Sequence, residues 1–600
     1  MKMRVTSATV ATCLLFLQSC AAVLKNGAGR ESPNVLFLVI DDLRPALGCY
    51  GYQNVITPNI DQLAAKGIKF NNAFVQQAVC GPSRTSFLTG RRPDTTRLYD
   101  FYSYWRTAAG NFTTLPQHFK ESGYFTASVG KVFHPGISSN FSDDAPYSWS
   151  VPAYHPPTQK FKMKKVCPGP DGQLHMNLVC PVDVKSQPLG SLPDIQSADY
   201  AVEFLQNVSA SSQTSPKQPF FLAVGFHKPH IPFKYPREFQ DLYPLFNIHL
   251  APNLSLPPDL PTIAWNPFTD IRKREDVKAL NISFPYGPVP RKFQLLMRQG
   301  YYAATSYTDS QVGRVLAALD EQGLATNTIV VLVGDHGWSL GEHQEWAKYS
   351  NFEVATRVPL ILYVPGVTHQ PVRGDSTFPY IDALESCINE IPNHNIVNAP
   401  SGGNDNVLVQ KNSCNKAGLP HCRLQTLPEE GHESDALVEL VDIFPTLAEM
   451  ANLRTPPLCP TDSSKVELCT EGSSFVPVIL NVTGGTSRQN IVTSWKPAVF
   501  SQYPRPSEQP QINSDLPHLK DIQYMGYSMR TEQYRYTEWV AFNPDTFKPD
   551  FDLVAARELY LHDTDELEDH NVAGKSEYRH LLTQLSQQLR KGWRNALPSQ

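Results

Sequence analysis

The sequence predicts an α/β protein with a doubly wound, largely parallel central sheet, helices on both faces, and a smaller C-terminal α+β subdomain. Several short runs of aliphatic and β-branched residues lack alternation, which is typical of strands buried on both faces. Amphipathic stretches lie between these runs, and such an alternation is typical of doubly wound folds. At 600 residues, 41% hydrophobic and 18% charged, the composition also excludes a disordered or collagenous chain.

The first predicted strand covers residues 35–40 and ends at Asp41 and Asp42. Three later runs of the same character predict further strands at 220–224, 329–333 and 359–364. Amphipathic stretches predict helices, for example at 60–65, 307–319 and 437–450. One large α/β domain therefore accounts for most of the chain.

Changes in composition suggest how the chain is divided. Residues 371–433 are loop-like and predict an insertion, and the polar, glycine-rich sequence 481–487 is the best candidate for a domain boundary. The remaining C-terminal part is too short for a second doubly wound sheet. We therefore expect a signal peptide at 1–22, a short N-terminal or pro segment at 23–32, the main domain at 33–480 and the subdomain at 481–600.

The N-terminus has the layout of a secretory signal peptide. Lys2 and Arg4 precede an apolar run at 8–17 that is too short to cross a bilayer, and small residues follow at 21–22. A bacterial lipoprotein cleavage box at 17–20 is the alternative interpretation. No later segment reaches the roughly 18 apolar residues of a membrane helix, so we expect a soluble protein outside the cytosol, with no membrane span.

Sequons and charge fit this expectation. Six Asn-x-Ser/Thr triplets follow the signal peptide, and glycosylation requires all of them to lie on the surface: Asn111, Asn140, Asn207, Asn253, Asn281 and Asn481. Fifty-two basic and 57 acidic residues give a net charge of −5. This near balance removes the bulk electrostatic reason to expect nucleic-acid binding.

Nine of the eleven cysteines remain after the signal peptide is removed, which is an odd number for a secreted protein. Two pairs bracket short loops, and their small separation makes two local disulfides geometrically easy: Cys167 with Cys180, and Cys459 with Cys469. The pairing of four others stays open: Cys49, Cys387, Cys414 and Cys422. The ninth, Cys80, has the most informative neighbours.

Residues 80–90 predict a helix that begins at a cysteine. Pro82 suits a first turn and Gly90 suits a C-terminal stop. Cys80 would then lie at the positive end of the helix, with Arg84 one turn further on the same side, a position that stabilises an anion. A structural cysteine near a turn is the alternative, and for an isolated cysteine it is the better one.

Polar residues also cluster just beyond the predicted strands, at 41–42, 227–230 and 335–336. In open α/β sheets ligands bind beyond the carboxyl ends of the strands, so these segments could converge on one cleft. Two adjacent carboxylates at a buried strand end repel each other, which a divalent cation would relieve. An N-cap pair on a following helix is the alternative, but Arg44-Pro45 and Gly48 favour a loop there.

The motif around Cys80 resembles the sulfatase signature C-x-P-S-R-x-x-x-L-T-G, which fixes Cys80, Pro82, Ser83, Arg84, Leu88, Thr89 and Gly90. In that family the cysteine is oxidised to formylglycine during secretion, so the resemblance implies that a formylglycine-generating enzyme acts on Cys80. It also explains the odd cysteine. Three further segments resemble sulfatase elements: 130–136, with one extra residue between Lys131 and His134, then 226–232 and 338–348.

The resemblance implies a role for each matching residue. One Ca²⁺ per active site would be bound by Asp41, Asp42, Cys80, Asp335 and His336. Many sulfatases have Asn in place of His336, and an imidazole admits softer metals, so calcium rests on the resemblance more than on the ligand types. Arg84, Lys131 and His134 would hold the hydrated aldehyde, with Asp335 as base, while Lys348 and His230, favoured over His227, would grip the sulfate and protonate the leaving oxygen.

In the family scheme, residue 80 carries two hydroxyl groups. One of them, polarised by the metal, attacks sulfur in line with the departing sugar oxygen. The second then loses its proton and expels sulfate, which restores the aldehyde. An unmodified serine or cysteine lacks this second hydroxyl and should stall at the sulfated intermediate.

Longer segments at 41–45, 90–97, 334–343 and 501–506 resemble lysosomal sulfatases that degrade glycosaminoglycans. They imply a monomeric hydrolase that reaches the lysosome by the secretory pathway and removes the 2-O-sulfate from non-reducing-end iduronate of heparan sulfate and dermatan sulfate. Basic residues around the cleft, among them Arg505, would pair with the uronate carboxylate. The alternatives are another sulfatase, a phosphate or phosphonate ester hydrolase on the same scaffold, or a non-catalytic glycosaminoglycan-binding protein.

Overall fold

The computed structural model describes residues 32–211, 218–372, 374–386, 431–484 and 495–598. The expected signal peptide and pro segment, most of the expected insertion, and Cys387, Cys414 and Cys422 lie outside the described residues.

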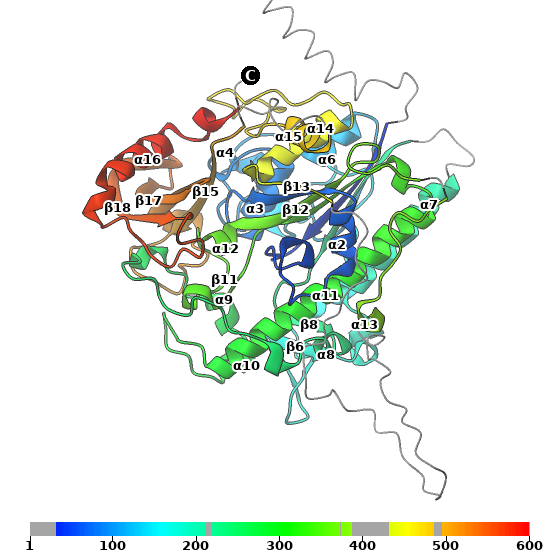
Figure 1. The fold of residues 1–600 in the computed structure, drawn as a ribbon, viewed down its shortest axis with the longest axis horizontal. Coiled ribbons are helices and arrows are strands. Elements are labelled where there is room, and N and C mark those ends of the chain that lie inside the picture. Colours follow the sequence, from blue (N-terminus) through cyan, green and yellow to red (C-terminus); the bar gives the residue numbers. More distant parts are fainter. Residues whose placement is uncertain (1–31, 212–217, 373, 387–430, 485–494, 599–600) are drawn as a thin grey trace, which may run out of the picture.

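A mixed, mainly parallel sheet lies between two layers of helices (Figure 1). At its centre β1 pairs in parallel with β7 and β9, and β3 extends the parallel part beyond β7. This confirms the predicted fold class. In spatial order the strands are β13 (His432–Ser434), β2 (Ile68–Phe74), β12 (Arg357–Tyr363), β9 (Thr328–Gly334), β1 (Asn34–Ile40), β7 (Phe220–Phe226) and β3 (Phe125–Gly130), and β14 (Val438–Glu439) also pairs with β2.

The strand predicted at 359–364 differs from the others in direction. As β12 it runs antiparallel to both β9 and β2. A parallel neighbour needs a crossover connection, usually a helix of a dozen or more residues. The connection from β9 to β12 contains the small hairpin β10 (Ser339–Leu340) and β11 (Trp346–Ala347), the 3-10 helix η9 (Glu342–Gln344) between its strands, and the four-residue helix α12 (Glu353–Thr356). None of these is long enough for a crossover, so the chain returns beside β9 in the opposite direction.

Alternate residues of β1 enter two separate cores, which explains why this strand has no polar face. Leu36, Leu38 and Ile40 share one core with α2 (Pro58–Ala65), α7 (Pro193–Ser211) and α11 (Arg291–Glu321). Val35, Phe37 and Val39 share the other with α3 (Cys80–Thr89), α6 (Leu115–Glu121), α14 (Ile443–Met450) and α15 (Val476–Thr483). The predicted helix 307–319 is the C-terminal part of the longer α11, and only 443–450 of the predicted helix 437–450 is α-helical.

The C-terminal part is an antiparallel sheet with a helix against it, shown in orange and red in Figure 1. Its members are β15 (Ala498–Arg505), β16 (Tyr524–Thr531), β17 (Tyr534–Asn543), β18 (Lys548–Leu561) and α16 (Arg579–Lys591). The Ser501 hydroxyl and the Gln502 amide donate hydrogen bonds to the carbonyls of Val75 and Gln76, so β15 is joined to the end of β2. The predicted boundary at 481 falls within α15.

The two predicted disulfides, Cys167–Cys180 and Cys459–Cys469, are both present. Five of the six sequon asparagines are exposed, as glycosylation requires. Asn253 is not: only 7% of it is exposed, and its Nδ2, the atom a glycan would modify, lies 3.0 Å from Nε2 of His343. The prediction that Asn253 lies on the surface is therefore wrong. Within the described residues, no helix has the length and apolar character needed to cross a bilayer.

Candidate active site

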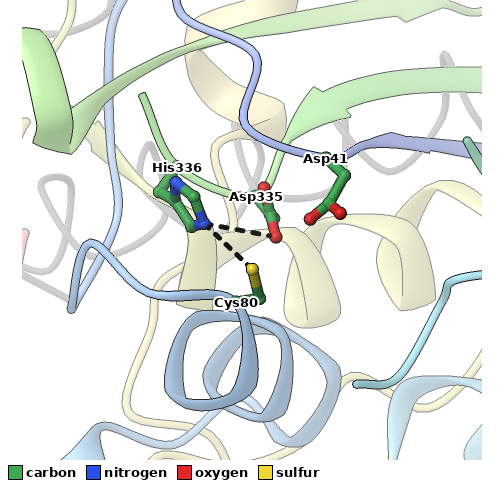
Figure 2. A group of neighbouring side chains, drawn as sticks. All are labelled: Asp41, Cys80, Asp335 and His336. Carbon is green, nitrogen blue, oxygen red and sulfur yellow. Dashed lines mark hydrogen bonds and ion pairs between the residues drawn. The ribbon is translucent and has the colours of Figure 1, made fainter. Parts of the chain in front are cut away.

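The polar segments beyond β1, β7 and β9 meet at the carboxyl edge of the sheet. Backbone hydrogen bonds continue each ladder by one residue, from the Asp41 amide to the Phe226 carbonyl and from the Asp335 amide to the Ile40 carbonyl, both at 3.2 Å. The predicted convergence of Asp41, Asp335 and His336 is visible in Figure 2, where they face Cys80. The parallel register of three neighbouring strands thus builds the centre.

Cys80 is the first residue of α3, as the sequence predicts, and it is 1% exposed. Gly90 ends this helix with φ 65°, a left-handed conformation that favours glycine. The Cys80 Sγ lies 3.1 Å from Nζ of Lys348 and 3.3 Å from Nε2 of His336. Burial, and then the negative charge of Asp41, raises the pKa of the Cys80 thiol to about 12. An unmodified Cys80 is thus protonated at physiological pH and a poor nucleophile.

Three buried carboxylates are held by three buried cations. Arg84 bridges two of them, with Nε 2.8 Å from Asp335 Oδ2 and Nη2 3.1 Å from Asp41 Oδ1. The Lys131 Nζ lies 2.6 Å from Asp41 Oδ2. The Lys348 Nζ lies 2.7 Å from Asp42 Oδ1. Arg84, Lys131 and Lys348 therefore all surround the same centre, where the sequence placed them.

The positive charge around Asp42 is not sufficient to balance its buried carboxylate. Its Oδ2 is buried and has no hydrogen-bond partner among the described residues. Burial raises the pKa of Asp42 to about 7, with Asp41 and Asp335 adding repulsion that Lys348 only partly offsets. Its backbone has φ 61°, and the Tyr301 hydroxyl holds its carbonyl at 2.8 Å. A carboxylate kept in this uncommon conformation with an unpartnered oxygen is suited to bind a cation.

The surrounding atoms fit a metal ion. Ligand atoms of Asp41, Cys80, Asp335 and His336 lie within 4.8 Å of one another, and those of Asp41, Asp42, Cys80 and His230 do as well. The Nδ1 of His336 lies 2.9 Å from the Gly337 carbonyl, so Nδ1 carries the proton and Nε2 keeps its lone pair. Most donors are carboxylate oxygens, which hard divalent cations prefer.

Of the two candidate histidines, His230 reaches the centre. Its Nε2 lies 4.0 Å from Oδ2 of both Asp41 and Asp42, and its Nδ1 donates to the Ile231 carbonyl at 2.6 Å. Burial, and then Lys162, lowers the pKa of His230 well below its ordinary value, so the ring is neutral. His227 instead lies with Nδ1 3.3 Å from Asp194. The sequence-based choice of His230 fits this geometry.

His134 has a less direct position. Its ring stacks on Phe101, with centroids 4.0 Å apart, and its Nδ1 has no hydrogen-bond partner among the described residues. Burial, and then the charge of Lys131, lowers the pKa of His134 well below its ordinary value. The described contacts place His134 next to the Lys131 charge and include no hydrogen bond to Cys80.

Arg505 does not have the position the sequence suggested. It is 1% exposed, and its guanidinium donates to the backbone carbonyls of Ile263, Ala264, Tyr349, Pro504 and Ser514. A guanidinium with these partners is not available to a substrate carboxylate. Its contact with Tyr349, at 2.8 Å, instead joins it to the segment that carries Lys348.

Sequence reasoning missed the residues that hold this lysine segment. Asn266 donates from Nδ2 to the carbonyls of Trp346 and Lys348, and the Tyr349 hydroxyl donates to Asp270 at 2.6 Å. Ala347 and Tyr349, on either side of Lys348, have φ of 73° and 79°. No motif marks Asn266 or Asp270, because their partners lie about 80 residues further along the chain.

Comparisons with known proteins agree with this centre. The family model described as "Sulfatase" matches residues 33–393. Human iduronate 2-sulfatase is 54% identical over 555 residues, which cover 91% of this chain and 92% of that protein. The mouse protein of the same name is 52% identical, over 95% and 96%. In fold, the chain resembles a phosphonate monoester hydrolase from Silicibacter pomeroyi, with a TM-score of 0.59, 19% identity, and coverage of 94% and 96%. Because the family model matches more than half of the chain and includes the centre around Cys80, this protein belongs to the sulfatase family.

Proposed function

We propose that the chain is a sulfuric ester hydrolase that removes the 2-O-sulfate from non-reducing-end iduronate of heparan sulfate and dermatan sulfate. The observation that carries the reaction is the buried Cys80 at the start of α3, with Lys348 at 3.1 Å and three carboxylates around it. The human and mouse relatives, both named iduronate 2-sulfatase and more than half identical over nine tenths of the chain, support the choice of sugar.

Cys80 must be modified for this chemistry, and we propose that a formylglycine-generating enzyme carries out the modification during secretion. The buried thiol, with its pKa raised to about 12, is not a nucleophile in its own right. A hydrated formylglycine supplies one hydroxyl to attack sulfur and a second that, once deprotonated, releases sulfate. The pattern of Pro82, Ser83 and Arg84 after Cys80 supports this assignment.

Asp41, Asp42, Asp335 and His336, with residue 80, would hold one Ca²⁺. The unpartnered Oδ2 of Asp42 supports a cation at this position. A bound divalent cation polarises oxygen atoms and neutralises the charge of a sulfate ester. The His336 nitrogen is the ligand that would also accept softer metals.

The cationic residues would position the reacting groups. Arg84 and Lys131 hold Asp41 and Asp335 in place, and Asp335 is the base for the attacking hydroxyl. His134 lies beside Lys131, where its neutral ring can accept a hydrogen bond from the hydroxyls of residue 80.

Two groups would bind sulfate and protonate the leaving oxygen. Burial opposes the charge of Lys348, but the negative charges around it, Asp42 first, together outweigh burial and raise the pKa of Lys348 well above its ordinary value, so the amine stays protonated. It therefore holds sulfate oxygens as a fixed cation. His230 is neutral without substrate, and an arriving sulfate favours its protonated form, which then gives its proton to the leaving sugar oxygen.

The remaining assignments follow from this function. We propose a monomer that reaches the lysosome through the secretory pathway, with the glycosaminoglycan as its substrate and without nucleic-acid partners. The net charge of −5 and the exposed sequons support these proposals. We also propose residues 33–480 as the catalytic domain and 481–600 as a subdomain that closes one side of it.

The test compares three substrate classes on protein secreted from cells. We expect turnover of an iduronate 2-sulfate, with much weaker turnover of aryl sulfates and of phosphonate monoesters, the last chosen because of the shared fold. Cys80→Ala should abolish turnover without a change in melting temperature, and mass spectrometry of the residue-80 peptide should show an aldehyde. A free thiol in active protein, or equal turnover of all three classes, would refute the proposal.

A further inference from the structure

A pocket rich in cations lies beside the carboxylate centre. It has a volume of about 400 Å³, measured with its open mouth, and His230 borders it. Lys162, Lys228 and Lys234 line it, and of its described lining residues Asp194 is the one acid. Asp194 is already engaged, because it accepts hydrogen bonds from the backbone amides of His227 and Lys228 at 2.7 and 2.9 Å.

Lys234 in the pocket lining and Arg274 beside it are two buried cations, and among the described residues no carboxylate forms an ion pair or hydrogen bond with either of them. Lys234 is 8% exposed, and Arg274, which lies close enough to influence its charge, is 3% exposed. The Nε and Nη1 atoms of Arg274 have no hydrogen-bond partner among the described residues. The amine of Lys234 likewise forms no hydrogen bond or ion pair with any described residue. Burial, and then Arg274, lowers the pKa of Lys234 to about 8.

The nearby carboxylates compensate for these charges only in part, because Asp270 and Asp276 act on Arg274 without an ion pair or hydrogen bond to it among the described residues. Asp276 accepts hydrogen bonds from the amides of Leu178 and Val179, at 2.7 and 3.1 Å, and Asp270 accepts one from Tyr349. A buried charge without a hydrogen-bonded partner is costly, and proteins retain such groups mainly where a ligand completes them.

Lys162 brings a third cation to the same space. It follows the short helix η3 (Pro157–Phe161) and has no ion pair or hydrogen bond of its amine among the described residues. Lys162 lines the pocket together with His230, and its charge acts on both His230 and Asp41, so it lies near the centre as well. Lys228 differs, because its Nζ donates to the carbonyls of His230 and Pro232 and so supports the loop.

We propose that Lys162, Lys234 and Arg274 bind a second anionic group of the substrate, a carboxylate or sulfate on the sugar chain, while its 2-sulfate lies at residue 80. The inference rests on the proposed function and names what distinguishes the preferred substrate: an additional oxyanion. His230 borders both the pocket and the centre, so one sugar chain spans the two. The bound oxyanion supplies the partner that Arg274 and Lys234 lack.

The test compares three substrates: iduronate 2-sulfate linked to a sulfated glucosamine, the same disaccharide without sulfate on the glucosamine, and the uronate methyl ester of the first. Lys162→Met and Lys234→Met should each raise KM about tenfold, which corresponds to one lost charged contact, and Lys234→Met should leave kcat nearly unchanged. The effect should disappear for the substrate that lacks the bound group, which identifies that group. Lys160→Met is the matched control, an exposed lysine of η3 outside the pocket lining.

The melting temperature distinguishes a role of Lys234 in anion binding from a structural role. Lys234→Met removes an unpartnered buried charge, so its melting temperature should stay equal or rise, and Lys234→Arg should keep the wild-type KM. Equal KM changes for all three substrates, or the same change in Lys160→Met, would overturn the inference. Calorimetric binding of the three sugars to Cys80→Ala tests the pocket without turnover, and equal affinity for all three there would overturn it too. Inactivity of the wild-type protein on all three substrates would instead count against the proposed function.

Discussion

His336 is the residue at which this chain departs from many sulfatases, which have asparagine there. Its Nε2 lies 3.3 Å from both Cys80 Sγ and Asp42 Oδ1, so it takes part in the centre directly. Burial lowers the pKa of His336 to about 4, which leaves the nitrogen free to bind a metal at neutral and mildly acidic pH. An imidazole ligand broadens the range of acceptable metals beyond calcium.

We therefore expect His336→Asn to change metal preference more than calcium binding. An amide oxygen replaces a nitrogen, so the affinity for Zn²⁺ should fall about tenfold or more while that for Ca²⁺ changes by less. Titration of the chelator-treated protein with each metal measures both. Asp42→Asn is the control and should weaken both metals, because it removes a carboxylate from the centre. A selective loss of Ca²⁺ binding in His336→Asn would contradict this assignment.

At the scale of elements, the segment 346–349 that carries Lys348 is fixed from outside. Asn266 and Arg505 bind its carbonyls, and residues with φ of 73° and 79° lie on either side of Lys348. Such strained conformations persist only where the surroundings enforce them. The position of the Lys348 amine beside Cys80 therefore depends on Arg505, which touches no reacting group itself.

Arg505→Lys should lower kcat together with stability and leave KM nearly unchanged. A lysine amine cannot reproduce five carbonyl contacts in a planar arrangement, so the segment relaxes and Lys348 moves away from residue 80. We expect a loss of kcat of at least about tenfold and a lower melting temperature. A rise in KM with kcat retained would show instead that Arg505 reads the substrate. Arg530→Lys, near the C-terminal end of β16, is a control for loss of a guanidinium that pairs with Glu353 and has no hydrogen bond to segment 346–349 among the described residues.

The residues around the centre show which positions could be predicted from the sequence and which could not. Cys80 and Arg84 belong to one helical motif, and Asp41 and Asp335 follow hydrophobic strands, so local pattern was enough to find them. Arg505 belongs to a recognisable motif too, but its role depends on carbonyls supplied by distant loops. Lys234 and Arg274 carry no motif, because Lys234 lies in the short strand β8 (Phe233–Pro236) and Arg274 lies far along the chain, just before the helix α10 (Glu275–Lys278). The direction of β12 likewise depends on a connection whose path no periodicity records.

At the scale of the whole molecule, a buried ion-pair network joins the main domain to the C-terminal sheet. Glu439 accepts a bidentate pair of hydrogen bonds from Arg92, both at 2.7 Å, and pairs with Lys496 at 2.7 Å. Glu439 also accepts a hydrogen bond from the backbone amide of Phe500 in β15 at 2.9 Å. Arg92 lies in the connection after α3, so this network also supports the helix that begins at Cys80.

Glu439→Gln should destabilise the protein by about 3–5 kcal/mol, because it leaves Arg92 buried without its ion-pair partner, while Lys496 keeps its pair with Asp442. Denaturant unfolding measures this free energy. Glu433→Gln is the matched control, since Glu433 is exposed and, among the described residues, forms an ion pair with Lys69 alone, so a change of about 0–1 kcal/mol is expected. Equal effects of the two substitutions would argue that the network does not join the two parts.

Buried carboxylates also set how the stability of the molecule responds to pH. Burial raises the pKa of Glu345 to about 7 and that of Asp515 to about 6. Their stabilisation is complete below their unfolded pKa of about 4 and is lost as the pH rises through 6 and 7. Burial acts the same way on Glu439, but Arg92 and Lys496 outweigh it and lower its pKa to about 2. Its stabilisation is therefore complete above about pH 4.5 and is lost as the pH falls toward 2.

These opposing titrations predict a melting temperature that is highest near about pH 4.5 and falls on both sides, because Glu345 and Asp515 lose their stabilisation from about pH 4 upward and Glu439 loses its stabilisation below about pH 4.5. Scanning calorimetry between pH 3 and pH 8 measures the curve. Glu345→Gln keeps the oxygen that accepts the Asn266 amide and removes the titration, so it should flatten the alkaline side only. Glu439→Gln should flatten the acid side only. A melting temperature that rises steadily from pH 5 to pH 8 would contradict this account.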